Sequence, residues 1–108
     1  MRNMDLAPVV LFVYNRVETT IQTLSCLVAN TLASKTDLFI YSDGGKDISS
    51  WRQVNLLRRY LRSISGFKTV TIVEREKNYY LERNIIEGVT DIVNRFGKII
   101  VLEDDVCV

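Results

Sequence analysis

Acidic side chains stand directly after two apolar runs of the sequence. Glu103, Asp104 and Asp105 follow one run, and Asp43 follows another. Carboxylate oxygens are ligands that Mg²⁺ and Mn²⁺ prefer in proteins. The chain contains no histidine, which excludes Ser-His-Asp and Cys-His triads and the usual catalytic zinc sites. The sequence therefore predicts oxygen-ligated Mn²⁺ or Mg²⁺, with Asp104 and Asp105 available to hold it.

Other polar residues follow the remaining apolar runs. Arg16 comes two residues after the first run and Asn78 follows the third. If the runs are parallel strands in the order 3-2-1-4, the first and fourth are neighbours, and Arg16 lies close to the acidic cluster. An arginine that faces carboxylates there indicates a phosphate and a metal. No G-x-G-x-x-G or P-loop motif occurs, so a diphosphate would need a cation in place of a glycine-rich cradle.

The elements that must position these residues alternate along the chain. Apolar, β-branched runs predict strands at 7–14, 37–42, 68–73 and 98–102. Between them, apolar residues recur at helical spacing. The first helix has Ile21, Leu24, Val28 and Leu32; the second, capped by Ser49 or Ser50, has Val54, Leu57, Leu61 and Ile64; the third has Leu81, Ile85, Val89, Ile92 and Phe96, with Gly97 beyond it.

This alternation predicts the fold class. It is α/β: a Rossmann-like three-layer α/β/α arrangement with a mainly parallel four-stranded sheet and the order β-α-β-α-β-α-β. With 108 residues, 47% of them hydrophobic and 25% charged, the composition is that of one globular domain over 1–108. The two glycines after Asp43 are expected to permit a turn that other residues would resist.

Charge and hydropathy exclude several classes of function. Fourteen basic and thirteen acidic residues give a net charge of +1, which offers no case for nucleic-acid binding. The arginines of the second predicted helix are expected on its solvated face; they are Arg52, Arg58, Arg59 and Arg62. The longest apolar run, 6–14, is too short to span a bilayer. Cys26 and Cys107 form no C-x-x-C unit, and both are expected as inert thiols of a cytoplasmic protein.

Four segments together resemble a known family. PVVLFVYNR, DLFIYSDGG, NYYLERN and KIIVLEDDV, in this order, are similar to the nucleotide-binding half of GT-A-fold, nucleotide-sugar-dependent glycosyltransferases. The nearest kin are bacterial family-two-like enzymes and the N-acetylglucosaminyltransferase I group, and the resemblance covers 8–108. It implies a UDP-sugar-type donor, a saccharide acceptor, and a chain that is the first part of a longer catalytic domain. It assigns no catalytic base, so this chain alone is expected to be inactive. Because the rest of the catalytic domain would cover one edge of the sheet, this chain is also expected to self-associate through that exposed edge.

The resemblance also implies roles for single residues. Asp43 would bind the base of the donor, and Arg16 would lie beside the nucleotide. Asp105 would be the metal ligand of the DXD-like motif, with Glu103 and Asp104 contacting the ribose or orienting that ligand. Asn78 and Arg83 would lie around the nucleotide and the sugar.

Each residue also has a plainer interpretation. Asp43 could bond its own backbone in a turn, the acidic pair could be solvated carboxylates at a strand end, Arg16 could be a surface residue at a helix start, and Asn78 and Arg83 could be surface or capping residues. A non-catalytic flavodoxin-like or receiver-like module that binds Mg²⁺ is the alternative for the whole chain. Receivers gather their acids after early strands, whereas this cluster ends the fourth.

Overall fold

The sheet has four parallel strands, as the sequence predicts, and their order is β3-β2-β1-β4, which is the order that the predicted contact between Arg16 and the acidic cluster takes as its condition. The computed structural model describes residues 6–104. The strands are β1 (Val9–Val13), β2 (Asp37–Ser42), β3 (Thr69–Glu74) and β4 (Ile100–Glu103). The helices are α1 (Val17–Val28), α2 (Ile48–Leu61) and α3 (Tyr80–Phe96), with a short 3₁₀ turn at Ala33–Lys35. This is the strand order of the Rossmann fold. The first three strands are added in one direction across the sheet, and β4 is then added on the other side of β1.

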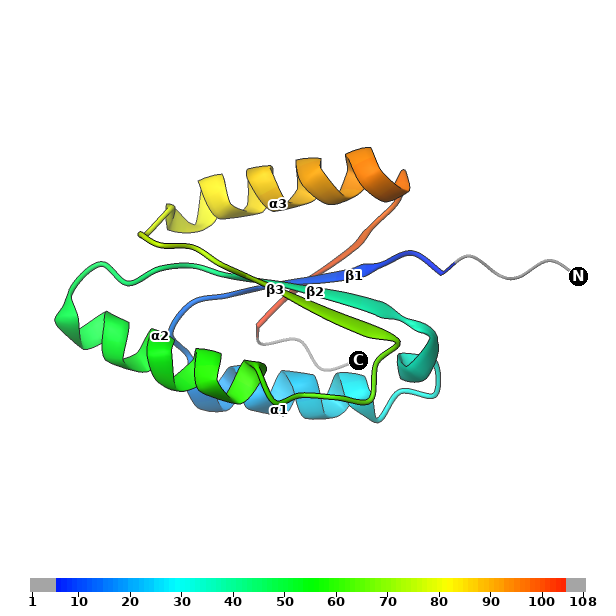
Figure 1. Cartoon of the computed structure of the whole chain (residues 1–108), viewed down its shortest axis with the longest axis horizontal. Helices are drawn as coiled ribbons and strands as arrows, with labels where there is room; N and C mark the ends of the chain where they lie inside the picture. Colours follow the sequence, from blue (N-terminus) through cyan, green and yellow to red (C-terminus); the bar gives the residue numbers. More distant parts are fainter. Residues whose placement is uncertain (1–5, 105–108) are drawn as a thin grey trace, which may run out of the picture.

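The sheet separates two hydrophobic cores. Helices α1 and α2 cover one face and α3 covers the other (Figure 1). The first core joins β1 and β2 to α1 and α2 through Leu11, Val13, Leu24, Leu27, Leu38, Ile40, Leu57 and Leu61. The second joins the same strands to α3 through Val10, Phe12, Phe39, Tyr41 and Ile92. Residues alternate between the two faces along a strand, so β1 and β2 are apolar on both sides and lie at the centre of the sheet.

Two helix boundaries differ from the sequence prediction. Helix α1 ends at Val28, so Leu32 lies beyond it and both side chains are exposed. Thr20 and Leu27 are buried on the helix in their place. Helix α2 is capped by Asp47, whose side chain accepts from the Ser50 N–H at 2.8 Å while the Ser50 hydroxyl accepts from the Asp47 N–H. This capping box makes Ser50 the partner of the cap rather than the cap itself.

Arg58 contradicts the expectation of a solvated arginine face on α2. Its residue is 6% exposed, and its guanidinium donates to Ser42 Oγ and to the carbonyls of Ser42, Asp43 and Arg75 at 2.8–3.2 Å. Burial lowers the pKa of this guanidinium. The hydrogen bonds replace the water that burial removes, because several backbone carbonyls at the ends of β2 and β3 converge on one side chain. Arg52, Arg59 and Arg62 are exposed, as predicted.

The β4 edge is thinly covered. Ile100 and Val101 are 46% and 43% exposed, and β1 is the neighbour with which β4 pairs among the described strands. The exposed strand edge is the kind that invites pairing with another chain. Self-association through it stays a prediction.

Two further expectations concern the chain's surroundings. Within the described residues, no helix is both long enough and apolar enough to cross a membrane. Cys26, expected to be a free thiol, is disulfide-bonded. Cys107 lies outside the described residues. The cytoplasmic location stays a prediction.

Candidate functional site

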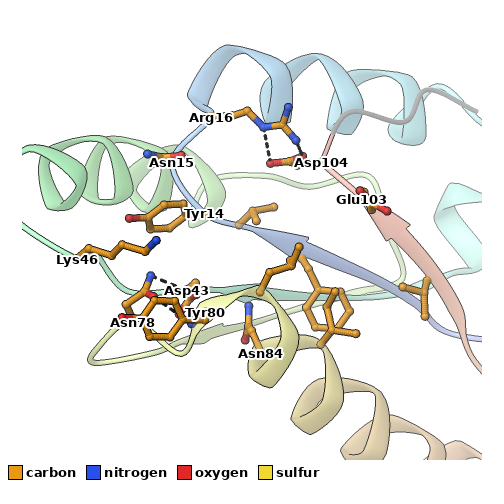
Figure 2. Close-up of a pocket in the computed structure, with 15 residues that line it drawn as sticks. Tyr14, Asn15, Arg16, Asp43, Lys46, Asn78, Tyr80, Asn84, Glu103 and Asp104 are labelled. Atoms are coloured by element: carbon orange, nitrogen blue, oxygen red, sulfur yellow. Dashed lines mark hydrogen bonds and ion pairs between the residues drawn. The ribbon is translucent and has the colours of Figure 1, made fainter.

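A cavity of about 330 Å³ opens where β1, β2 and β4 end, beside the start of α3 (Figure 2). Its apolar lining comes from β1, α3 and β4: Phe12, Val13, Leu81, Ile85 and Val101. Polar and charged residues from the loops after the strands complete it. The position is the one that ligands occupy in open parallel sheets, beyond the carboxyl ends of the strands where the strand order reverses.

Asp43 is buried at the end of β2, with 4% of the residue exposed. Its Oδ1 accepts the Gly44 N–H at 2.9 Å and the Tyr79 N–H at 2.7 Å. Its Oδ2 accepts a long hydrogen bond of 3.4 Å from Asn78 Nδ2. The carboxylate is therefore part of the loop structure through one oxygen, and Oδ2 is the oxygen with acceptor capacity left for a ligand.

Asn78 joins the β2–α2 loop to the β3–α3 loop. Its Nδ2 donates to the Gly44 carbonyl at 2.7 Å, and its Oδ1 accepts the Tyr80 N–H at 3.0 Å. The side chain thus fixes the distance between the two loops that form one side of the cavity. Asn78, expected after the third strand, thus lies at the rim, and the structure brings it into contact with Asp43 and Gly44.

The glycines after Asp43 serve close approach rather than an unusual backbone conformation. Among the described glycines, the positive φ values belong to Gly66 and Gly97. A Cβ on Gly44 would lie 2.5 Å from the backbone carbonyl carbon of Lys77, and one on Gly45 would lie 2.5 Å from the Trp51 ring. The expectation that these glycines permit a special turn is wrong. They allow a neighbouring loop and an indole to pack against the chain.

Arg16 and Asp104 form an ion pair across the ends of β1 and β4. Two contacts of the guanidinium go to the Asp104 carboxylate, from Nε to Oδ2 at 3.3 Å and from Nη2 to Oδ1. The Arg16 side chain is 53% exposed, whereas that of Asp104 is 9% exposed. The Asp104 carbonyl also accepts the Thr23 hydroxyl at 2.7 Å, which ties this strand end to α1. The predicted contact between Arg16 and the acidic cluster is present.

The rest of the acidic cluster is described in part. Glu103 lines the cavity, and Asp105 lies outside the described residues. Within residues 6–104, no group of three or more Asp, Glu, His or Cys side chains could enclose a metal ion. A divalent cation at the described carboxylates would need further oxygens from a ligand, as Mg²⁺ is commonly bound with substrate phosphates.

Comparisons with protein-family models, with curated proteins and with solved structures found no match to this chain. The site must therefore be judged on its own geometry.

Arg83 does not belong to the lining of the cavity. Its Nε lies 2.8 Å from Glu87 Oε2, one helical turn further along α3, and its guanidinium lies 4.0 Å from the centroid of the Tyr79 ring. The carboxylate of Glu87 raises the pKa of Arg83. The structure thus places this residue on the outer surface of α3, in agreement with the plainer interpretation.

Five polar residues of the lining are assigned no role by the resemblance: Tyr14, Asn15, Lys46, Tyr80 and Asn84. Asn84 is 1% exposed and accepts from Arg75 Nε at 3.1 Å. Tyr14 directly follows β1, so the strand-end rule that selected Arg16 could have found it. Lys46 lies in the β2–α2 loop and Tyr80 is the first residue of α3, and at neither position does a periodic pattern indicate the direction of the side chain.

Proposed function

We propose that the cavity binds the nucleoside diphosphate of a UDP-sugar-type donor, as the donor-binding part of a metal-dependent glycosyltransferase whose acceptor is a saccharide hydroxyl. One observation carries the proposal: the loops after β1, β2, β3 and β4 converge on one cavity at the reversal of strand order. Arg16, Asp43, Asn78, Glu103 and Asp104 all line it. The motifs that resemble the glycosyltransferase family are thus the segments that build the cavity.

The cavity carries charges of both signs, with more carboxylates than cations in its lining. An anionic ligand would therefore depend on the two cations or on a bound divalent cation. Lys46 and Arg16 supply two cations at its rim, and the apolar floor can accept a planar base or the faces of a sugar. The Asp43 Oδ2 atom is an acceptor for a ring N–H of the base. A uracil has such an N–H, whereas an unprotonated cytosine lacks it at the corresponding ring position.

A divalent cation could bind these oxygen donors only in competition with Arg16. Asp104 and Glu103 offer hard oxygen ligands, but the Asp104 carboxylate is already paired with Arg16. The metal would therefore compete with the guanidinium for that carboxylate. When bound, Mg²⁺ or Mn²⁺ would neutralise the diphosphate and stabilise it as a leaving group. The protein's own part is to hold Asp104 at the cavity, through the Thr23 hydroxyl and the pairing of β4 with β1.

The receiver-like alternative is not supported by the order of the described strands. Flavodoxin-like modules have the order 2-1-3-4-5, with the third strand beside the first. Here β4 is beside β1, and β3 lies at the opposite edge. No observation on the site favours that module.

Titration calorimetry with UDP, with and without EDTA, tests the proposal. We expect binding in Mn²⁺ or Mg²⁺ that is lost on chelation, and weaker binding of NAD or ATP. Equal affinity for UDP in both conditions would contradict the role of the metal. Preference for NAD or ATP would contradict the family that the motifs resemble.

Asp43→Asn tests the base contact separately from the fold. The amide keeps one acceptor oxygen for the Gly44 and Tyr79 N–H groups and replaces Oδ2 with a donor. We expect uridine affinity to fall by about tenfold in the absence of metal, since a hydrogen bond to a charged group is worth roughly 1.5–3 kcal/mol. The unfolding midpoint, measured on the same sample, should stay close to that of the wild type. Unchanged uridine affinity would assign base recognition to other residues.

A further inference from the structure

The first residue of α3 has an unusual backbone conformation. Tyr80 has φ = 64°, and among the described residues it is the non-glycine with positive φ. A bulky residue in the left-handed region is strained, and such strain persists where surrounding contacts enforce it. The contacts here are the hydrogen bonds of the Tyr79 N–H to Asp43 and of the Tyr80 N–H to Asn78. The strain is thus imposed by the side of the cavity that Asp43 and Asn78 build.

The Tyr80 ring is little stabilised by packing against the rest of the fold. The residue is 63% exposed although it lines the cavity. Its nearest ring contact among the aromatic and cationic groups is Lys46, whose Nζ lies 5.0 Å from the ring centroid. Figure 2 shows the Lys46 side chain reaching from the β2–α2 loop toward the space beside Tyr80 and Asn78. An aromatic ring is therefore held at the cavity mouth at a conformational cost, with one face toward a cation.

Lys46 differs from the other cation of the cavity. Arg16 is paired with Asp104. Lys46, in contrast, has no carboxylate oxygen within 4.0 Å of its ammonium group among residues 6–104. A cation–π contact at an exposed site is weak and readily exchanged. The Lys46 charge is therefore available to an anionic ligand without breaking an ion pair.

We propose that Tyr80 and Lys46 form an exchangeable clamp for the nucleoside diphosphate: the base stacks on the Tyr80 ring and displaces the ammonium, which then binds a phosphate of the same ligand. The inference rests on the proposed nucleotide-binding function. It adds a stacking platform and a phosphate contact that the carboxylates and Asn78 do not supply. Stacking of a base on an aromatic side chain is stronger than an exposed cation–π contact, so the exchange favours the bound state.

The test compares uridine with UDP across variants by titration calorimetry. Tyr80→Phe keeps the ring, and we expect both affinities to be unchanged. Tyr80→Gly removes the ring and tolerates the positive φ. We expect both affinities to fall by about 5- to 100-fold, while the thermal midpoint is unchanged or higher because the strain is relieved. Wild-type uridine affinity in Tyr80→Gly would overturn the stacking role.

Lys46→Met tests the phosphate contact. UDP affinity should fall by roughly tenfold, the usual effect of losing one charge-assisted hydrogen bond, whereas uridine affinity should stay the same or rise slightly because the ring is vacated. Equal losses for uridine and UDP would overturn the phosphate role. Lys68 is exposed and lies just before β3, at the end of that strand opposite to the cavity. Lys68→Met therefore removes the same charge away from the cavity and should change neither affinity. If the wild type binds neither uridine nor UDP, the proposed function fails together with the clamp; the variant outcomes above overturn the clamp alone.

Discussion

Two buried carboxylates face the same cavity and are held in different ways. Asp43 is 4% exposed and Asp104 is 7% exposed, and each follows the end of a strand. Asp43 accepts two backbone N–H groups, from Gly44 and Tyr79. Asp104 is held by the guanidinium of Arg16, whose side chain is 53% exposed. A backbone donor cannot leave unless the loop moves, whereas an exposed side chain can rotate away.

Because they are held differently, the β2 side and the β4 side of the cavity are expected to recognise different properties of a ligand. The β2 side of the cavity, built by Asp43, Asn78 and the buried Arg58, is fixed by hydrogen bonds to the main chain. The β4 side carries an ion pair with a half-exposed guanidinium, and we expect a ligand or cation to exchange with it. The first side can therefore select a ligand by fit, and the second can respond to its charge.

The largest effect that we expect on folding comes from Arg58→Ala, below the β2 side. It leaves the carbonyls of Ser42, Asp43 and Arg75 without the guanidinium that they share. Removing one partner of a buried charged network costs about 3 kcal/mol in the free energy of unfolding. Urea denaturation measures it, with Arg59→Ala, exposed on the same helix, as the matched control. Equal effects of the two variants would contradict the role of Arg58 in fixing this side.

A direct test compares the two carboxylates. Asp43→Ala should lower the free energy of unfolding by about 2 kcal/mol, because two backbone N–H groups lose a charged acceptor. Asp104→Ala should lower it by less than about 1 kcal/mol, since its partner is an exposed cation that water can solvate. Urea denaturation of both variants at the same pH gives the comparison. A larger loss for Asp104→Ala would mean that the ion pair supports the fold rather than serving as an exchangeable contact.

The sequence predicts the alternation of strands and helices and the residues at the rim of the cavity, because both follow from short-range patterns. The order of the strands within the sheet depends on long-range pairing, so short-range patterns leave it open. Apolar runs and helical spacing locate the four strands and three α-helices of residues 6–104, though not the 3₁₀ turn at Ala33–Lys35. Parallel strands bring Arg16, Asp43, Asn78 and Asp104 to one edge. The burial of Arg58 depends on carbonyls from two strands, which helical spacing does not report. The resemblance implies a site role for Arg83, whereas helical spacing offers Glu87, four residues later, as its ion-pair partner. The backbone conformation of Tyr80 depends on contacts that its residue type does not report: the Tyr79 N–H donates to Asp43 in another loop, and the Tyr80 N–H donates to Asn78.

Alkaline pH should weaken the β2 side through Tyr41. Burial, followed by the hydrogen bond of its hydroxyl to Asp91, raises the pKa of Tyr41 to about 12. A raised pKa means that the neutral hydroxyl is favoured by folding, so this contribution is complete below about pH 10 and is lost as the pH rises toward 12. The free energy of unfolding, measured in urea between about pH 9 and 11.5, should decline less steeply in Tyr41→Phe. Identical slopes for variant and wild type would contradict the assignment to Tyr41.

The smallest expected effect on stability comes from Arg16→Gln, on the β4 side. An ion pair with an exposed partner contributes about 0.2–1 kcal/mol, so the unfolding midpoint should change little. Loss of the guanidinium leaves the Asp104 carboxylate available to a cation. Mn²⁺ affinity, measured by electron paramagnetic resonance without nucleotide, should therefore rise by roughly two- to fivefold. Adding Asp104→Asn should abolish that gain, and Arg52→Gln, which removes an exposed charge on α2, should not produce it. Weaker Mn²⁺ binding in Arg16→Gln would reverse the interpretation, because it would show that the guanidinium positions Asp104 for a cation rather than competing with one.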